Sequence, residues 1–336
     1  MPDPHGTPAR GTAPAPAGSP VTATGTAPAS VTVPVTVTVV ICTYTLRRWD
    51  ALAAGVRAAH AQLADGDELV VVVDHADDLL ARATAELPGR VVANSHGQGL
   101  SGARNTGVDL AGGDVVAFLD DDALPGRGWL ESLRRPFADP AVTGVAGAVD
   151  AAWEGGRGPR WFPPEFGWVV GCDYTGLAAA GERVRNPIGA SMALRRKPVA
   201  AVGGFSELVG RVGALPVGCE ETELAIRLAQ RDPATTVVRA GDGSVAHQVP
   251  RDRQTLRYFV SRCYHEGRSK AVLSGLVGTQ QGLAAERAYA SRTLPLGVLR
   301  HTAAVARGDL TGPARAAVIV LGLLTTALGY LSARRR

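Results

Sequence analysis

Alternation between short β-branched runs and helical segments is the feature that most restricts how this chain can fold. The first β-branched run begins at Val31 and ends near Cys42, and further runs occupy residues 68–73, 90–94 and 114–119. Helical periodicity separates them over residues 49–64, 78–87 and 101–111. Runs this continuously apolar are typical of buried parallel strands. The sequence therefore predicts a doubly wound, mixed but mostly parallel α/β sheet that binds its ligands at the carboxyl ends of its strands.

Downstream of Asp122 the regular alternation ends. Helices are expected at residues 129–137, 197–202 and 220–230, and strands at 142–149, 189–194, 236–239 and 243–247. An irregular segment, residues 153–168, holds Trp153, Trp161 and Trp168, three of the five tryptophans. Aromatic side chains bury well in many settings. The segment is therefore interpreted either as a lid or acceptor platform, or as a loop that packs on the core.

The two ends of the chain differ from the central region, which we place at residues 31–275. Residues 1–30 are dominated by Pro, Ala and Thr, which predicts a disordered tail and not a signal peptide. A helical extension is expected at residues 276–336. Within it, residues 316–333 carry no charge, whereas Arg315 precedes them and three arginines follow. An interfacial helix, a single span and a buried helix all fit this run, with membrane contact favoured.

Composition restricts the class of protein and its compartment. With 35 basic and 31 acidic side chains, the net charge of +4 is too small to indicate a nucleic-acid binder. The four cysteines, Cys42, Cys172, Cys219 and Cys263, form no CxxC pair. We therefore expect reduced thiols in a cytoplasmic protein, without a zinc ribbon or a disulfide scaffold.

Three consecutive carboxylates, Asp120, Asp121 and Asp122, follow an apolar strand and give the strongest chemical signal. Like charges this close repel one another, and a divalent cation removes the conflict. Hard oxygen ligands select Mg²⁺ or Mn²⁺, which bridge to the phosphates of a bound nucleotide. A polar turn in which Asp122 caps a helix would explain only one of the three. His247 ends another expected strand and is a candidate further ligand, although an isolated histidine is more often structural.

Two other groups of polar residues are candidates for contact with a nucleotide or a phosphate. Asp74 directly follows the strand at residues 68–73, where a carboxylate either accepts from a base or ribose hydroxyl or caps the next helix. A glycine-rich turn precedes Arg104 and Asn105 in the helix at residues 101–111. Helix N-termini and arginine both suit phosphate, while a surface position is the alternative for Arg104.

A third cluster opens the helix expected at residues 220–230, which begins with Glu220, Glu221 and Glu223. Stabilisation of the helix dipole and an i,i+4 pair with Arg227 explain Glu223. Glu220 and Glu221 project about 100° apart. At most one of them therefore points straight into a site, while the other supports it.

Taken in this order, the segments resemble the family 2 glycosyltransferases with the GT-A fold. The similarity covers about residues 35–270 and is carried by residues 35–44, 100–107, 116–122, 203–205 and 219–227. Segments 73–75, 168–172 and 218–223 are also similar to actinobacterial proteins of the glucosyl-dolichyl-phosphate glucuronosyltransferase type. This second similarity implies a polyprenyl-linked acceptor.

The family resemblance implies inverting, metal-dependent transfer from a UDP- or GDP-linked sugar to an acceptor hydroxyl of a saccharide or lipid-linked molecule, such as a cell-envelope glycan. The nucleotide would be held by Thr43, Tyr44, Asp74, Arg104, Asn105, Asp120 and Asp121. The metal would be held by Asp122 and His247, with Asp120 contacting the metal or the ribose. Glu221 would be the catalytic base, supported by Glu220.

This chain departs from the family pattern at two positions. Glu221 stands where the family usually has aspartate, and His75 stands where many members have a second acid. A nucleotidyltransferase is the enzymatic alternative, but residues 43–45 replace the basic glycine-rich loop that it would need. A catalytically degenerate sugar-nucleotide binding module is the other alternative. We expect a cytoplasmic location, at the inner face of the plasma membrane if residues 316–333 contact lipid.

Overall fold

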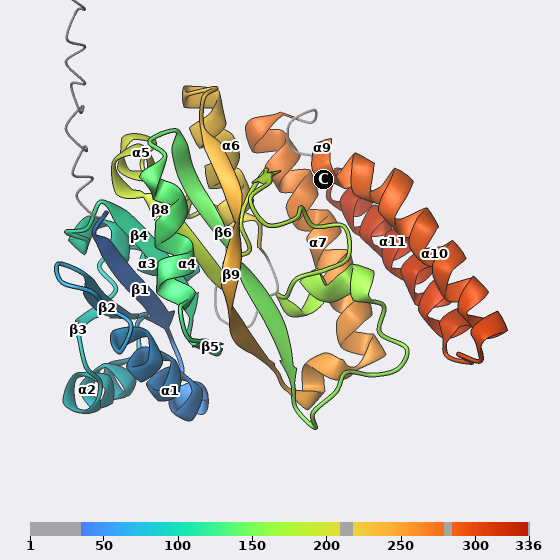
Figure 1. Ribbon diagram of the computed structural model, residues 1–336, viewed down its shortest axis with the longest axis horizontal. Helices are drawn as coiled ribbons and strands as arrows, with labels where there is room; N and C mark the ends of the chain where they lie inside the picture. Colours follow the sequence, from blue (N-terminus) through green and yellow to red (C-terminus); the bar gives the residue numbers. More distant parts are fainter. Residues whose placement is uncertain (1–34, 209–217, 279–283, 335–336) are drawn as a thin grey trace, which may run out of the picture. The chain divides into compact units, whose positions relative to one another are not determined.

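A mixed β-sheet runs through the computed structural model, which describes residues 35–208, 218–278 and 284–334 (Figure 1). In the described part, the sheet has nine strands in the order β3-β2-β1-β4-β8-β6-β9-β5, and β7 pairs with β9. The strands are β1 Val37–Thr43, β2 Glu68–Val73, β3 Arg90–Ala93, β4 Val115–Asp120, β5 Ala123–Pro125, β6 Val142–Trp153, β7 Arg183–Val184, β8 Ser191–Arg195 and β9 Thr236–Val249.

Parallel pairing dominates the N-terminal half of the sheet. Strand β1 pairs in parallel with both β2 and β4, and β2 pairs in parallel with β3. Antiparallel β8 joins this half to β6, which runs parallel to β9, and β5 returns antiparallel to β9. The predicted mixed α/β sheet is confirmed. Its register sets Cys42 of β1 opposite Asp120, so the carboxyl ends of β1 and β4 meet at one edge.

Helices cover both faces of the sheet. In β1, Val37, Val39 and Ile41 enter the core on the side of α1, α2 and α4, whereas Val40 enters the core on the side of α3, α5 and α6. This is the two-residue alternation of a strand buried on both faces. The helices are α1 Trp49–His60, α2 Asp77–Glu86, α3 Leu100–Leu110, α4 Trp129–Arg134, α5 Arg196–Ala201, α6 Glu220–Arg231, α7 Leu256–Val277, α9 Ala284–Ala288, α10 Leu294–Ala303 and α11 Gly312–Arg334.

Several expected elements have different bounds in the structure. The helix expected at residues 129–137 ends at Arg134 and continues as a 3₁₀ turn that contains Pro136, since proline has no N–H for the helical ladder. The strands expected at 236–239 and 243–247 are one strand, β9. The tail at residues 1–30, and residues 31–34 of the first expected strand, lie outside the described residues.

The aromatic segment at residues 153–168 packs on the core, as one of its two interpretations expected, and it also contributes to a cavity wall. The rings of Trp161, Phe162 and Phe166 all contact Phe259 of α7, with centroids 6.0, 6.0 and 5.1 Å away. These rings pack on the core. Trp168, in contrast, lines a cavity and donates its Nε1–H to the Tyr289 hydroxyl over 3.3 Å.

A buried carboxylate ties the same segment to the C-terminal helices. Glu165 is fully buried and pairs with Arg300, and it lies 3.1 Å from Nε2 of His301. Both partners belong to α10. Because a buried charge is costly without partners, this contact fixes α10 against the 3₁₀ helix Pro164–Val170, which also contains Trp168.

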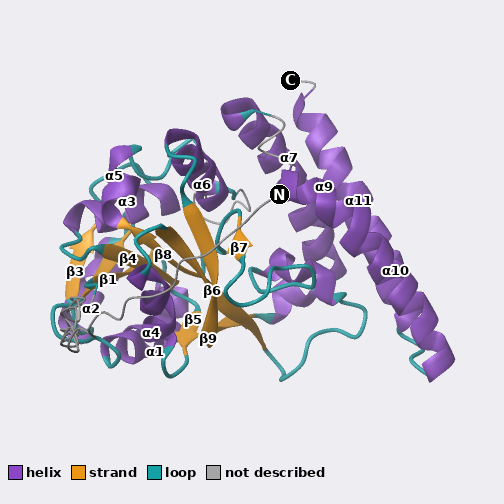
Figure 2. Cartoon of the chain, turned by 45° about the horizontal axis from the view of Figure 1, so that its top comes forward, coloured by secondary structure: helices purple, strands orange, loops and turns teal. Residues whose placement is uncertain are grey.

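Helices α7, α10 and α11 pack beside one another (Figure 2). Helix α7 begins at Leu256 and runs to Val277, across the boundary expected at residues 275–276. By length and composition α11 could cross a membrane. An 18-residue window of this helix has a mean hydropathy of 1.9, and 33% of the window is buried inside the protein. The other side of α11 is an exposed apolar face made of Val320, Leu321, Leu323, Leu324, Leu328 and Leu331.

Close approach of α7 and α11 depends on glycine. At Gly267 of α7, a Cβ would overlap the carbonyl oxygen of Thr326, and at Gly329 of α11 it would overlap the carbonyl oxygen of Tyr264. At Gly275, on the same helix α7, no atom from the described residues beyond its own helical backbone and chain neighbours lies within 4 Å of an added Cβ. Gly267 and Gly275 lie on the same helix, but only Gly267 lies against α11. They are therefore a matched pair for testing this helix contact.

We predict that Gly267→Ala lowers the free energy of unfolding by about 1–3 kcal/mol, because the helices would be forced apart. Gly275→Ala should raise it by up to about 1 kcal/mol, because alanine is the better helix former. Denaturant unfolding of both variants measures the two effects. Equal destabilisation by both substitutions would show that α7 and α11 do not pack as closely as described.

Candidate functional site

Two adjoining cavities open at the carboxyl edge of the sheet. The large cavity, of about 1440 Å³, is lined by residues that follow β1, β2 and β4 and by the end of β9. The small cavity, of about 420 Å³, is lined mainly by the start of α6, the segment at residues 166–190 and the C-terminal helices. Asp120, Arg253, Tyr258 and Leu100 line both cavities. Asp120, the first of the three consecutive carboxylates, therefore stands where the two cavities meet.

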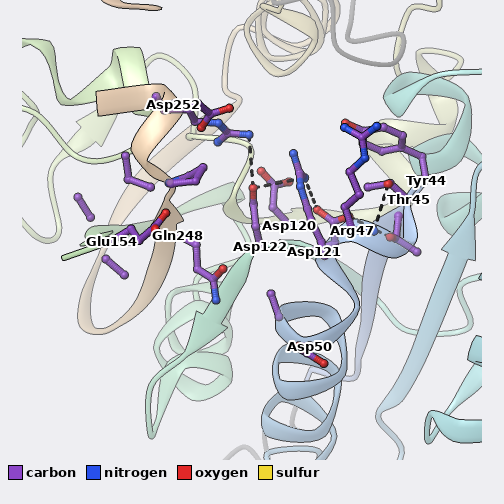
Figure 3. A pocket seen from close by; sticks show the side chains of 18 of the residues that line it. Tyr44, Thr45, Arg47, Asp50, Asp120, Asp121, Asp122, Glu154, Gln248 and Asp252 are labelled. Carbon is purple, nitrogen blue, oxygen red and sulfur yellow. Dashed lines mark hydrogen bonds and ion pairs between the residues drawn. The ribbon is translucent and has the colours of Figure 1, made fainter. Parts of the chain in front are cut away.

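Strand β4 delivers these carboxylates directly, since it ends at Asp120 and β5 begins at Ala123. Figure 3 shows Asp120, Asp121 and Asp122 together in the large cavity, between the loop of Tyr44 and the segment of Gln248. Asp121 and Asp122 are buried, whereas Asp120 is half-buried. The predicted cluster is therefore part of a cavity wall and not a surface turn.

Asp121 is held from the β1 side. Its carboxylate accepts from the Thr43 hydroxyl over 2.9 Å and from Nη1 of Arg48 over 2.6 Å. Burial raises the pKa of Asp121 to about 6, which Arg48 only partly opposes. Thr43 and Tyr44 both line the large cavity. Arg48 was not foreseen, because it lies 73 residues from its partner in the sequence.

Asp122 is held from the β9 side. Pairing of β5 with β9 sets Ala123 opposite His247, and this places Nε2 of His247 3.1 Å from the Asp122 carboxylate. Arg48 and Arg253 lie 3.3 and 3.6 Å from the same carboxylate. Burial alone would raise the pKa of Asp122, but these cations outweigh burial and lower it. Burial alone would lower the pKa of His247, but Asp122 raises it to about 10.

Asp120, Asp122 and His247 can hold a divalent metal. One ligand atom from each lies within 4.8 Å of the others. Two carboxylates and an imidazole are a donor set that suits Mn²⁺ or Mg²⁺. On the far side of the ring, the Cys172 sulfur lies 3.8 Å from Nδ1 of His247. An Nδ1–H that faces this sulfur leaves the Nε2 lone pair free for a metal, the usual arrangement of a ligating histidine.

Asp74 and Asn105 are used in ways that the sequence did not reveal. Asp74 lines the large cavity, but its carboxylate accepts from the Asn94 side chain over 2.7 Å and from the Gly99 N–H over 2.9 Å. It therefore fixes the loop that starts α3. Asn105 lines neither cavity, because its amide group exchanges two hydrogen bonds with the backbone of Phe205, at 2.9 and 2.7 Å.

Arg104 is buried and lies between the carboxylates of two elements. Its Nη1 donates to Glu220 over 3.0 Å, and its Nη2 lies 3.5 Å from Asp120. The position excludes the surface alternative for this side chain. Arg104 instead connects the carboxyl end of β4 to the first residue of α6.

Glu220 and Glu221 have different surroundings. Glu220 is buried against Arg104, and its Oε2 has no partner among the described residues. Glu221 is half-buried in the small cavity, where desolvation and the charge of Glu220 raise its pKa to about 7. Cys219, which directly precedes Glu220, has φ 86°, an unfavourable angle for a residue with a Cβ. Strain of this kind gathers at functional sites.

Comparisons with known proteins are consistent with this geometry. The model of "Glycosyl transferase family 2" matches residues 38–203. Over 242 residues, 70% of this chain and 77% of the relative, the chain is 33% identical to glucosyl-dolichyl phosphate glucuronosyltransferase of Haloferax volcanii. Over 65 residues, 19% of this chain and 14% of the relative, it is 48% identical to the pre-mycofactocin glycosyltransferase of Mycobacterium tuberculosis.

A solved structure shares the fold. The mannosyltransferase PcManGT from Pyrobaculum calidifontis, in complex with GDP-Man and Mn²⁺, matches with a TM-score of 0.53 at 19% identity, and 88% of each chain is covered.

Proposed function

The chain belongs to glycosyl transferase family 2, and we propose that it moves a sugar, with inversion, from a nucleotide-sugar donor to an acceptor hydroxyl across the boundary between its two cavities. One observation carries this proposal. In the group that can hold a metal, Asp122 lines the large cavity, His247 lines the small cavity and Asp120 lines both. Such a boundary is where a donor diphosphate and an acceptor would meet.

The large cavity is the proposed donor site. Thr43, Tyr44 and Asp74 lie on its wall at the carboxyl ends of the first strands, the position at which α/β sheets bind nucleotides. A bound Mg²⁺ or Mn²⁺ would neutralise charge on the leaving diphosphate. Arg48 and Arg253 line the same cavity and would add cationic hydrogen-bond donors. UDP and GDP are the nucleotides that we propose for this site.

Glu221 is the proposed catalytic base. Its carboxylate takes the proton of the acceptor hydroxyl as the acceptor oxygen bonds to the anomeric carbon, and the bond from that carbon to the diphosphate breaks. A base with a pKa of about 7 is well matched to proton transfer near neutral pH. Glu220 accepts a hydrogen bond from Arg104. This contact holds the Arg104 guanidinium beside the reacting groups.

A lipid-linked acceptor at a membrane surface is the finer part of the proposal. The relative from Haloferax volcanii is named for a dolichyl phosphate sugar. In this chain the exposed apolar face of α11 offers a surface for lipid contact. Arg315, which precedes the uncharged run, donates to Asp309 and to His301 and is therefore engaged within the protein. We therefore propose membrane contact through the apolar face, on the cytoplasmic side.

The pH dependence of kcat/KM tests the base. Because Glu221 must be ionised, we predict that kcat/KM falls as pH decreases through about 7. Glu221→Gln should lower kcat by roughly 100-fold or more and remove this acidic limb. Glu220→Gln should keep the limb but shift it to lower pH, because the charge of Glu220 raises the pKa of Glu221. If Glu220→Gln removes the limb and Glu221→Gln retains it, the two roles are reversed.

Membrane contact is tested by flotation with vesicles of phosphatidylcholine and phosphatidylglycerol. The full chain should float with the vesicles, and Leu324→Glu/Leu328→Glu should largely abolish this, because charge is placed on the apolar face. Leu208→Glu is the control, since Leu208 is 81% exposed and lies outside α11. Membrane contact through α11 is excluded if the full chain stays unbound at low salt or if the double variant floats equally well.

A further inference from the structure

A chain of ion pairs lines the small cavity and is not used by the donor chemistry. It is made of Arg262, Glu266, Lys270, Glu286 and Arg185, which we call the charged wall. Lys270 Nζ lies 3.4 Å from Glu266 and 2.8 Å from Glu286. All but Arg185 lie beyond residue 203, where the match to the family model ends.

The outer members complete the chain of alternating charges. Arg185 donates to both oxygens of Glu286, over 2.6 and 2.8 Å. Arg262 Nη1 lies 3.5 Å from Glu266. Buried ion pairs contribute little net stability because desolvation offsets their attraction. A wall of this kind therefore suggests a role in binding.

The order of charges indicates what would be bound. A phosphate is best recognised by several cations that point at it without competing acids. Here each cation has a carboxylate beside it. Such a surface presents donors and acceptors next to each other, which matches hydroxyl groups, because every hydroxyl can both donate and accept.

Aromatic rings form another part of the same lining. Trp168, Tyr174 and Tyr289 all line the small cavity. The rings of Tyr174 and Tyr289 lie edge to face, with centroids 5.5 Å apart. A pyranose ring has an apolar C–H face as well as a rim of hydroxyls, and a few polar groups set among aromatic side chains are typical of a small-molecule pocket.

The charged wall is connected to the proposed base at one point and to the protein surface at another. Cys219, which directly precedes Glu220 and Glu221, lies with its sulfur 3.6 Å from Glu266. Leu323 lines the small cavity and is also 39% exposed on the apolar face of α11. The cavity therefore reaches from the start of α6 to the helix surface that we propose contacts lipid.

We propose that the small cavity is an acceptor subsite for a sugar ring that carries a hydrocarbon chain, with the sugar hydroxyls on the charged wall and the chain leaving beside Leu323. This inference rests on the proposed function, because it assigns the acceptor of the same reaction. It commits to a sugar as the group that enters the cavity. A bare prenyl phosphate is the alternative that the test must separate.

The test uses the full chain with Mn²⁺ and a panel of UDP- and GDP-sugars. Hydrolysis or transfer of at least one donor establishes the proposed function before any acceptor is considered. The acceptor probes are octyl β-glycosides of glucose, galactose, mannose and N-acetylglucosamine, with farnesyl phosphate as the phosphate-bearing probe. At least one octyl glycoside should accept sugar, and farnesyl phosphate should not.

Lys270→Met and Arg268→Met form the matched pair of variants. Both residues lie on α7, but Lys270 is buried in the charged wall and Arg268 is exposed. Lys270→Met should raise KM for the glycoside at least tenfold while KM for the donor stays within twofold. Arg268→Met should change neither value. Trp168→Leu provides a second variant in the aromatic part, and it should also raise KM for the glycoside selectively.

The results that overturn the inference differ from those that overturn the proposed function. Absence of donor turnover and of Mn²⁺-dependent donor binding contradicts the proposed function itself. Donor turnover with transfer to farnesyl phosphate and to none of the glycosides contradicts only the sugar subsite. So does donor turnover without transfer to any probe. Equal KM values for the glycoside in the Lys270 and Arg268 variants would place the sugar outside the charged wall.

Discussion

Repulsion among three adjacent carboxylates is the constraint on which the rest of this site depends. Asp120, Asp121 and Asp122 follow one another at the end of β4, and two of them are buried. Each is offset by a cation from a different part of the chain. Arg104 of α3 lies near Asp120, Arg48 before α1 pairs with Asp121, and His247 of β9 pairs with Asp122. Bringing these cations together requires most of the sheet to be in register.

The C-terminal helices pack against the rest of the described chain and supply residues to its core and to the small cavity. Helix α7 supplies Phe259 to the core beneath the aromatic segment and Lys270 to the wall of the small cavity. Helix α10 supplies the partners of buried Glu165. Helix α11 packs against α7 through glycines, and its opposite side is apolar and exposed. An acceptor held at α11 would thus lie in the same compact unit as Glu221.

The sequence predicted what depends on local pattern. Valine-rich runs identified the parallel strands, and Asp120 to Asp122 identified the edge of the sheet at which the two cavities open, because both signals lie in short segments. Pairing between distant segments could not be read in the same way. The residues around Arg48 in the sequence do not indicate its contact with Asp121. Similarly, both amide hydrogen bonds of Asn105 are made with Phe205, 100 residues away. The sequence predicted the C-terminal helical region only from residue 276, whereas α7 already begins at Leu256, because polar residues spread around the helix hide the helical period.

We propose that Asp120, Asp122 and His247 bind one divalent metal together with the donor diphosphate. Electron spin echo envelope modulation of Mn²⁺ bound to the full chain, with UDP or GDP present, measures this directly. We predict nitrogen modulation from an imidazole together with phosphorus coupling from the diphosphate. The nitrogen modulation should disappear in His247→Gln and persist in His96→Gln, a histidine of neither cavity. Nitrogen modulation that is absent in the unmodified protein, or unchanged in His247→Gln, would contradict the claim.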